Sequence, residues 1–356
     1  MSRGPNPSDF RLRLLGWFGG SARDLPWRRS RDPYAIWISE IMLQQTRVAA
    51  VLEHYARFMK RFPTVRKLAE ASEQEVLAHW SGLGYYRRAR LLHQAAQFVA
   101  RNLDARLPAA SADLRTLPGI GEYTSAAIAS IAFGEPIACV DGNVERVLLR
   151  IRGWDENSAT AAEIRAAAGR LLDPTRPGDF NQAMMELGAT VCLPRAPLCP
   201  QCPVRGLCAT QGEHAVTARK KMRLRHSAYA LCERRSAGEP QVLLVQRSAD
   251  ASLMPGMWEL PELDPKLASQ GAKAITLRHS ITDTNYLVSI YVLGSGQIKA
   301  SLQSGKPREW FPRCDLHRLP LTGLARKVLK RLNAWPESKN AVSGMSLQQL
   351  EPGIRV

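Results

Sequence analysis

The chain of 356 residues has few of the features of a membrane, secreted or fibrous protein. It has no run of eighteen apolar residues, and its first segment, MSRGPNPSDF, has no apolar run of signal-peptide length. We therefore expect neither a membrane span nor secretion. Hydrophobic residues make up 45% and charged residues 23%, which argues against disorder or a fibrous repeat. The length predicts two domains, at about 100–200 residues each.

Acidic residues are scarce compared with basic ones. Asp and Glu number 32 against 49 Lys and Arg, which gives a formal charge of +17 and a pI near 10.0. Such an excess favours a polyanionic partner, and nucleic acid is the leading candidate.

Cysteine is scarce outside one segment. Four of the seven cysteines lie within residues 192–208, as Cys192, Cys199, Cys202 and Cys208. In a reducing compartment this clustering indicates a metal site and not a disulfide framework. Zinc ribbons usually pair two C-x2-C knuckles, and only one is present, so the spacing favours a 4Fe-4S cluster over zinc. Unrelated buried cysteines are the remaining alternative.

Strand-like alternation is essentially missing from the first half of the chain. Apolar residues recur there at three- and four-residue spacing, which predicts an all-α domain of about ten helices over residues 1–212. Positive charge without apolar periodicity predicts a linker at 213–226. Beyond it we expect a smaller α+β domain at 227–334 and a mobile tail at 335–356. In this second domain, we expect a strand at 227–233 to pair with one at 241–247, and a strand at 273–281 to pair with one at 285–293. We expect a helix at 322–332.

Glu40 stands among apolar neighbours in the expected helix 36–45 (IWISEIMLQQ). A carboxyl in such company would have a raised pKa and could act as a general acid near neutral pH. A glutamate on the solvated face of an amphipathic helix is the alternative. Gln44 and Gln45 follow, either as a plain helix cap or as side chains inserted among bases.

A glycine-rich turn, LPGIG at 117–121, opens another expected helix. The backbone N–H groups of a turn formed by Leu117, Gly119 and Gly121 can hold a phosphate without reading sequence. A simple turn between helices is the alternative. Downstream, Asp141 precedes a further helix, where it could be an N-cap or a catalyst.

A second flexible turn, GLGYYRR at 82–88, carries two aromatic rings. A ring such as that of Tyr85 can fill a vacated position in a base stack. A structural aromatic core is the alternative.

Residues 8–210 resemble the helix-hairpin-helix DNA glycosylase superfamily with an iron-sulfur cluster loop, the group that contains endonuclease III. Together with the cysteine loop, five segments are similar to the MutY-type adenine DNA glycosylases: ISEIMLQQT at 38–46, GLGYYRRAR at 82–90, LPGIGEYTS at 117–125, VDGNVERVL at 140–148 and FNQAMMELG at 180–188. The resemblance implies an enzyme that removes adenine mispaired with 8-oxoguanine or guanine from double-stranded DNA. Bifunctional relatives carry a lysine where this chain has Tyr123, and a phenol cannot form a Schiff base. The resemblance therefore implies a monofunctional enzyme that leaves an abasic site.

The same resemblance implies roles for individual side chains. Glu40 would protonate N7 of the flipped adenine, and Asp141 would stabilise the oxocarbenium-like sugar. Tyr123 and Asn143 would support Asp141 by hydrogen bonds. The implied DNA contacts are Gln44, Gln45 and Tyr85, the last two as a wedge, and the implied adenine pocket is Trp27, Arg28 and Gln182.

Residues 227–334 resemble the Nudix-like C-terminal domain of the same family, on VLLVQR at 242–247 and GMWELP at 256–261. The paired glutamates that bind magnesium in a Nudix hydrolase do not follow at 262–275 (ELDPKLASQGAKAI). We therefore expect no pyrophosphate hydrolysis.

The family's Phe-Ser-His turn, which touches 8-oxoguanine, is replaced here by Ile281, Thr282 and Asp283. We expect the Thr282 hydroxyl to keep the hydrogen bond to the lesion. Asp283 puts a negative charge close to the DNA, so the preference for 8-oxoguanine over guanine is in question.

Two other functions stay open at this point. A sibling enzyme that removes thymine from G:T mismatches shares the cluster and the hairpin turn, but lacks the second domain. A non-catalytic iron-sulfur DNA-binding regulator would need the cysteines and the basic charge, but neither Glu40 nor Asp141. For the enzyme, we expect a monomer in the bacterial cytoplasm, associated with the nucleoid.

Overall fold

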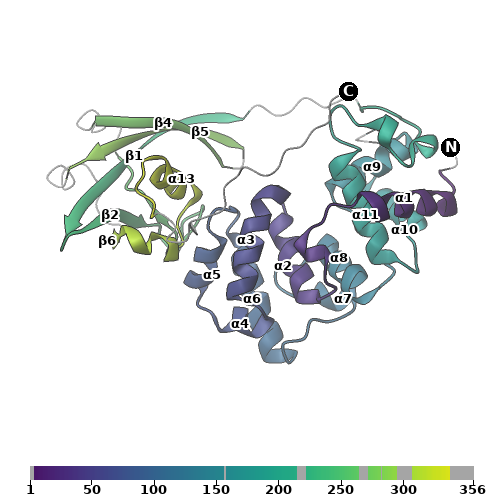
Figure 1. Ribbon diagram of the computed structural model, residues 1–356, viewed down its shortest axis with the longest axis horizontal. Helices are drawn as coiled ribbons and strands as arrows, with labels where there is room; N and C mark the ends of the chain where they lie inside the picture. The colour runs from purple at the N-terminus through teal and green to yellow at the C-terminus, as the bar shows by residue number, and fades with distance from the viewer. Residues whose placement is uncertain are drawn as a thin grey trace, which may run out of the picture. The chain divides into compact units, whose positions relative to one another are not determined.

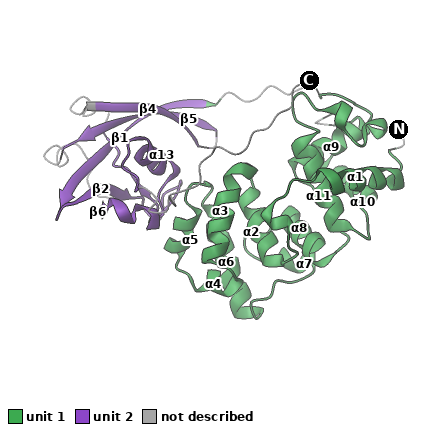
Figure 2. Cartoon of the chain, in the orientation of Figure 1, with its two compact units in different colours: residues 1–222 green, residues 223–356 purple. Residues whose placement is uncertain are grey.

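The computed structural model describes residues 4–155, 158–214, 222–263, 272–281, 283–294 and 307–336. The chain divides into two compact units, residues 1–222 and 223–356 (Figure 2). The boundary falls inside the segment expected to be a linker, of which residues 215–221 lie outside the described residues. The expected tail lies outside them from residue 337 onward.

Unit 1 is built from two groups of helices, and its described residues contain no strand (Figure 1). The first group shares a buried core that includes Phe10, Leu14, Val147 and Phe180. Its helices are α1 (Pro7–Ser21), α9 (Gly142–Arg152), α10 (Ala161–Leu171) and α11 (Pro177–Thr190). The second group is α2 (Pro33–Leu43), α3 (Val48–Arg61), α4 (Val65–Glu70), α5 (Glu73–Trp80), α6 (Arg87–Asn102), α7 (Ser111–Leu114) and α8 (Glu122–Phe133).

Local sequence sets the ends of these helices. The Asp32 side chain accepts a hydrogen bond from the Tyr34 N–H, and Pro33 then starts α2, three residues before the start expected from the sequence. At the other end of a helix, Gly153 follows α9 with φ 64°, a left-handed conformation that costs glycine little. Every residue of α2 from Tyr34 to Met42 is buried, because the helix has neighbours on all sides. A carboxyl on this helix is therefore removed from water.

Unit 2 is a sheet with a helix, so the expected α+β class is confirmed. The strand order is β3-β2-β1-β5-β4, with β6 also paired to β2. The elements are β1 (Arg223–Ser236), β2 (Glu239–Gln246), β3 (Trp258–Glu259), β4 (Ala272–Ile281), β5 (Thr284–Leu293), β6 (Arg308–Pro312), the 3-10 helix η5 (Arg313–Arg318) and α13 (Gly323–Arg331).

The two expected strand pairs are present as antiparallel ladders, β1 with β2 and β4 with β5. The sequence did not predict that β1 and β5 pair in parallel, from Arg223 opposite Thr284 to Cys232 opposite Leu293. This long-range ladder joins the two hairpins into one sheet. The apolar face of α13, with Leu324, packs in the same core as strand residues of the sheet such as Val288.

Candidate active site

A cavity of about 550 Å³ opens in unit 1, within the size range of small-molecule sites. Its walls come from the short 3-10 helix η1 (Pro26–Arg28), the end of α2, the starts of α8 and α9, and α11. Nine residues predicted from the sequence line it: Trp27, Arg28, Glu40, Gln44, Gln45, Tyr123, Asp141, Asn143 and Gln182. The fold thus brings together side chains that are up to 155 positions apart (182 − 27 = 155).

Glu40 lies near the end of α2 and is only 6% exposed. Burial raises the pKa of its carboxyl to about 7, because water no longer stabilises the charged form. A hydrogen bond from Tyr123 opposes this rise, the charge of Asp141 adds to it, and Arg28 opposes it. Glu40 therefore holds a proton over a substantial part of the neutral range, as the sequence predicted.

Tyr123 donates its hydroxyl proton to Oε2 of Glu40 over 2.7 Å. The prediction that this phenol supports Asp141 was wrong in that respect. The physical reason is that α8 packs against α2, which places the start of α8 next to the Glu40 carboxyl. Burial also raises the pKa of the phenol well above its ordinary value, so Tyr123 stays a donor throughout the neutral range.

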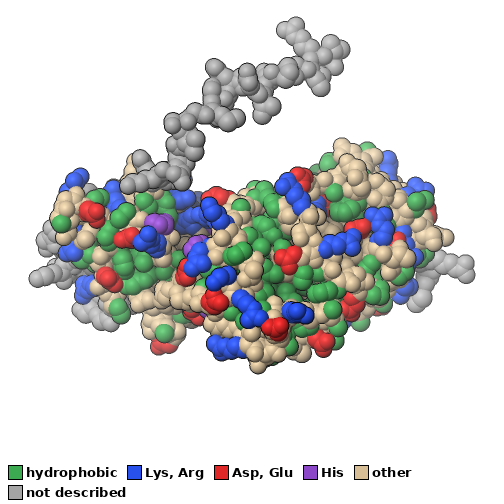
Figure 3. All heavy atoms as spheres, turned by 60° about the horizontal axis from the view of Figure 1, so that its bottom comes forward, with side chains coloured by type: hydrophobic (Ala, Val, Ile, Leu, Met, Phe, Trp, Pro, Cys, Tyr) green, Lys and Arg blue, Asp and Glu red, His purple; other side chains and the backbone are tan. Residues whose placement is uncertain are grey.

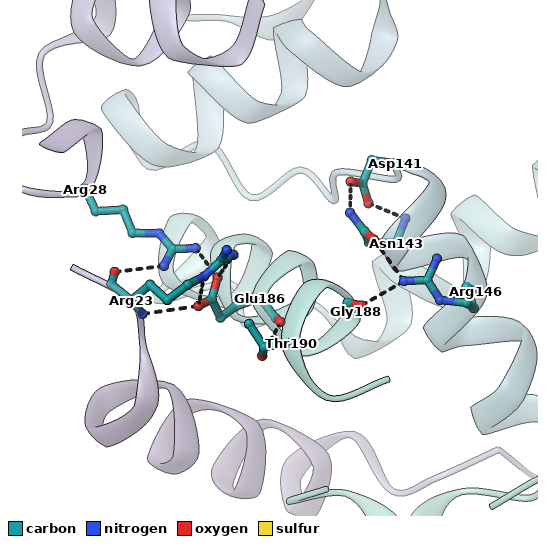
Figure 4. Close-up of polar contacts among 8 residues, drawn as sticks. All are labelled: Arg23, Arg28, Asp141, Asn143, Arg146, Glu186, Gly188 and Thr190. Carbon is teal, nitrogen blue, oxygen red and sulfur yellow. Dashed lines mark hydrogen bonds and ion pairs between the residues drawn. The ribbon is translucent and has the colours of Figure 1, made fainter. Parts of the chain in front are cut away.

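Asp141 is the N-cap of α9 (Figure 4). Its Oδ1 accepts from the backbone N–H groups of Asn143 (3.0 Å) and Val144 (2.8 Å), and its Oδ2 accepts from Nδ2 of Asn143 (2.9 Å). The predicted support from Asn143 is thus confirmed. Three donors and the positive end of a helix stabilise a negative charge on this side chain. Asp141 therefore caps α9 and also lines the cavity, so the two roles that the sequence left as alternatives, N-cap and catalyst, are compatible.

Arg146, whose role was not predicted from the sequence, holds Asn143 in place. Its guanidinium donates to Oδ1 of Asn143 (2.9 Å), to the Gly188 carbonyl (2.8 Å) and to the Cys192 carbonyl (2.9 Å). A Cβ at position 188 would stand 2.6 Å from Cβ of Asn143, so this approach of α11 to α9 requires glycine. Figure 4 shows the resulting chain of contacts from Asp141 to Gly188.

Glu186 anchors the opposite wall of the cavity and was also missed. Its side chain is fully buried and accepts hydrogen bonds from Arg23 Nε and Nη2 and from Arg28 Nη2, each over 2.7 Å (Figure 4). Burial opposes the ionisation of Glu186, but the hydrogen bonds from both arginines outweigh it and lower its pKa to about 2. Arg28 is thereby fixed in the wall of the cavity. The sequence around Glu186 did not indicate that this side chain is buried.

Asn181 fixes the segment that leads into Asp141. This buried side chain accepts from the Cys139 N–H (3.0 Å) and donates to the Ile137 carbonyl (2.8 Å) and to Oγ of Ser130 (2.9 Å). The segment between α8 and α9 is therefore tied to α11 on the other side of the cavity.

The predicted DNA-contacting residues of the two turns lie outside the cavity. Tyr85 is 49% exposed. In the LPGIG turn, Gly119 has φ 76°, and a Cβ there would meet Cβ of Leu91 at 2.6 Å. Leu117 is buried, its N–H donates to the Leu114 carbonyl, and its carbonyl accepts from the Ile120 N–H, so both of its backbone groups already have partners within the turn. Gly121 is the exposed N-cap of α8, whereas Thr282 lies outside the described residues.

The four clustered cysteines line one small pocket of their own, and none forms a disulfide. Arg150 donates to Sγ of Cys192 (3.3 Å) and to the carbonyls of Leu193 and Pro194. Within the described part of the chain, no three Cys, His, Asp or Glu side chains are close enough to hold a single metal ion. The donor set fits an iron-sulfur cluster.

Charge on the molecular surface is mixed on the side drawn in Figure 3, where Lys and Arg side chains are interspersed with Asp and Glu. Among the residues that the structure describes, no helix is long and apolar enough to cross a membrane.

Comparisons with curated proteins and with solved structures cover more than half of this chain. Residues 38–174 match the family model of the HhH-GPD superfamily base excision DNA repair protein. The human adenine DNA glycosylase is 41% identical over 313 residues, which cover 71% of this chain and 57% of that protein. The Arabidopsis thaliana adenine DNA glycosylase is 37% identical over 317 residues, which cover 76% of this chain and 49% of that protein. The chain thus spans about half of the length of the curated relatives that it matches.

Two solved structures share the helical architecture. A thermostable thymine-DNA glycosylase is 30% identical, with a TM-score of 0.54, and the match covers 58% of this chain and 96% of that one. An endonuclease III trapped in a covalent intermediate with DNA has a TM-score of 0.51 at 22% identity, over 58% of this chain and 97% of that one. The second likeness concerns the fold alone.

Proposed function

Because the chain belongs to the HhH-GPD superfamily of base excision DNA repair proteins, we propose that it is a monofunctional glycosylase that removes adenine mispaired with 8-oxoguanine or guanine. One observation carries the proposal. A buried carboxyl whose pKa lies at about 7, Glu40, shares a cavity with a second carboxylate, Asp141, which three hydrogen bonds hold in place. A proton donor and a fixed negative charge are the two groups that N-glycosidic cleavage requires.

The reaction begins with proton transfer to the base. Oε2 of Glu40 accepts the Tyr123 hydroxyl, so the transferable proton sits on Oε1 and passes to N7 of the flipped adenine. The bond between C1′ and N9 then breaks, and its electron pair leaves with adenine. Asp141 stabilises the positive charge that develops on the sugar. A water molecule adds to C1′ and loses one proton to solvent, from which Glu40 is protonated again.

Side chains in the cavity wall suit a purine with an exocyclic amine. The Gln182 amide oxygen can accept from the N6 amine, as amides do with adenine elsewhere, which leaves the N7 lone pair to the Glu40 proton. Trp27 is buried in the wall and offers an apolar ring face. Arg28, held by Glu186, supplies fixed donors. Two exposed side chains, Tyr85 outside the cavity and Gln45 at its edge, would replace the stacking lost when the base leaves the duplex.

Tyr123 supports the assignment as monofunctional. It occupies the position of the lysine in bifunctional relatives, and its hydroxyl is engaged with Glu40. A phenol cannot form an imine with the sugar, so strand cleavage through a Schiff base is not expected.

We also propose that Cys192, Cys199, Cys202 and Cys208 hold a 4Fe-4S cluster. Their shared pocket and their thiol donors support this proposal. When bound, the cluster would stabilise the loop and place its charge near DNA. The reaction steps above need only the residues of the cavity.

The proposal is tested with three duplexes that differ only in the mispair: A:8-oxoguanine, A:G and G:T. Single-turnover incubation should release adenine from the first two and no thymine from the third. The G:T duplex matters because the thermostable thymine-DNA glycosylase is 30% identical to this chain. Release of thymine without adenine would overturn the proposed substrate. Binding without release of either base would favour a DNA-binding regulator.

A further inference from the structure

Arg88, near the start of α6, links two segments that are distant in sequence. Its Nη1 donates to the carbonyls of Ile41 (2.7 Å) and Met42 (3.1 Å), and also to that of Gln44. These carbonyls lie at the C-terminal end of α2, where helical partners run out. Its Nη2 donates to Oγ1 of Thr46 (3.1 Å) and to the Gly84 carbonyl (3.3 Å). One guanidinium thus ties the end of α2 to the turn before α6.

The same guanidinium stands beside two residues in a rare backbone conformation. Gln45 has φ 54° and Tyr85 has φ 49°, in the left-handed region that side chains other than glycine seldom adopt. Arg88 bonds the carbonyl immediately before each of them, those of Gln44 and Gly84. Its guanidinium carbon also lies 5.4 Å from the centroid of the Tyr85 ring. One group therefore holds the backbone at both residues, and with it the direction in which each side chain leaves the chain.

We propose that Arg88 is a positioning residue that locks Gln45 and Tyr85 into one rigid wedge for the duplex. The inference rests on the proposed function, in which these two side chains enter the base stack. The planar fork of arginine can serve several oxygens at once, whereas a lysine ammonium presents three donors at one point. Because protein oxygens occupy both terminal nitrogens of Arg88 and its Nε is buried, this arginine acts through the wedge and not through a phosphate.

The test uses two A:G duplexes that differ only in the pairs beside the mispair, G·C in one and A·T in the other. A wedge should accelerate excision more where the base pairs beside the mispair stack more strongly, because unstacking the base then costs more free energy. Arg88→Met should therefore slow single-turnover excision more in the G·C context, by a factor of about ten relative to the A·T context, the spread expected between weak and strong stacking steps. Arg88→Lys should show the same dependence, less strongly. Arg87→Met, which removes an exposed charge from the same turn, is the matched control and should slow both contexts equally.

A readout of base unstacking separates positioning from general damage to the fold. With 2-aminopurine beside the mispair, Arg88→Met should bind the duplex but give a smaller rise in fluorescence than the unaltered protein. Equal losses in both contexts, or an unchanged fluorescence rise, would overturn the inference. If Arg88→Met fails to fold in a thermal melt, Arg88→Lys decides by the same criteria. Failure of the unaltered protein to release adenine would instead overturn the proposed function, and this outcome needs no variant.

Discussion

The pKa of Glu40 predicts how excision depends on pH. If the protonated carboxyl is the acid, the chemical step follows the protonated fraction. With a pKa of about 7, that fraction is about 0.9 at pH 6 and about 0.1 at pH 8, so the rate falls about tenfold over this interval. A carboxyl with the ordinary pKa of 4.5 would give a fall of about a hundredfold over the same interval, with no curvature.

The assay is single-turnover release of adenine from an A:G duplex, with the enzyme in excess, at half-unit steps from pH 5.5 to 8.5. Measuring duplex binding by Glu40→Gln at each pH separates effects on affinity from effects on chemistry. We expect a curve that bends near pH 7. A flat profile, or a straight tenfold fall per pH unit across the whole range, would refute the assignment of Glu40 as a buried acid.

Tyr123→Phe provides the structural control for this profile. The Tyr123 hydrogen bond lowers the pKa of Glu40, so its removal should raise that pKa and move the bend above pH 7. The variant should then keep a larger fraction of its maximal rate at pH 8 than the unaltered protein does. A bend that moves to lower pH would show that Tyr123 does not stabilise the ionised carboxyl.

Four further predictions follow from the other groups. Because Tyr123 carries no amine, excision should leave an abasic product that breaks only after alkali or heat, and a strong borohydride-dependent crosslink to DNA would contradict this. Glu186→Gln should lower the free energy of unfolding by roughly 2 kcal/mol at pH 7, since charged hydrogen bonds are lost. The pKa of Glu186 is lowered, so this contribution should be complete above about pH 5 and fade as pH falls toward 2 in urea titrations; a difference independent of pH would count against it. The purified protein should be brown with about four irons per chain, held by the loop 192–208, whereas one zinc and no colour would rule the cluster out. Thr282→Ala should reduce the preference for A:8-oxoguanine over A:G by about three- to tenfold, the value of one hydrogen bond, and an unchanged ratio would place lesion recognition elsewhere.

The parts of the site that the sequence predicted are those set by local neighbours. Apolar residues on both sides of Glu40 indicated its burial, and the position of Asp141 before a helix indicated its capping geometry. The burial of Glu40 and the capping by Asp141 each depend on residues within one or two helical turns. The local sequence was therefore sufficient to predict them.

The missed contacts all depend on which helices meet. Tyr123 reaches Glu40 across 83 positions, and Arg23 reaches Glu186 across 163. Nothing near Glu186 indicated burial, because its two arginine partners are supplied by the segment around η1. In unit 2, strand pairs joined by short turns were predictable, whereas the parallel pairing of β1 with β5 depends on segments about sixty residues apart. Long-range pairing of this kind is fixed by the assembled fold and leaves little trace in a local pattern.

The central claim is that Glu40 acts as the acid that releases adenine. It is tested most directly by comparing the unaltered protein with Glu40→Gln on an A:8-oxoguanine duplex under single-turnover conditions. We expect that the unaltered protein releases free adenine, and that the variant binds the same duplex with similar affinity but releases none. Adenine release by Glu40→Gln at a rate near that of the unaltered protein would contradict it.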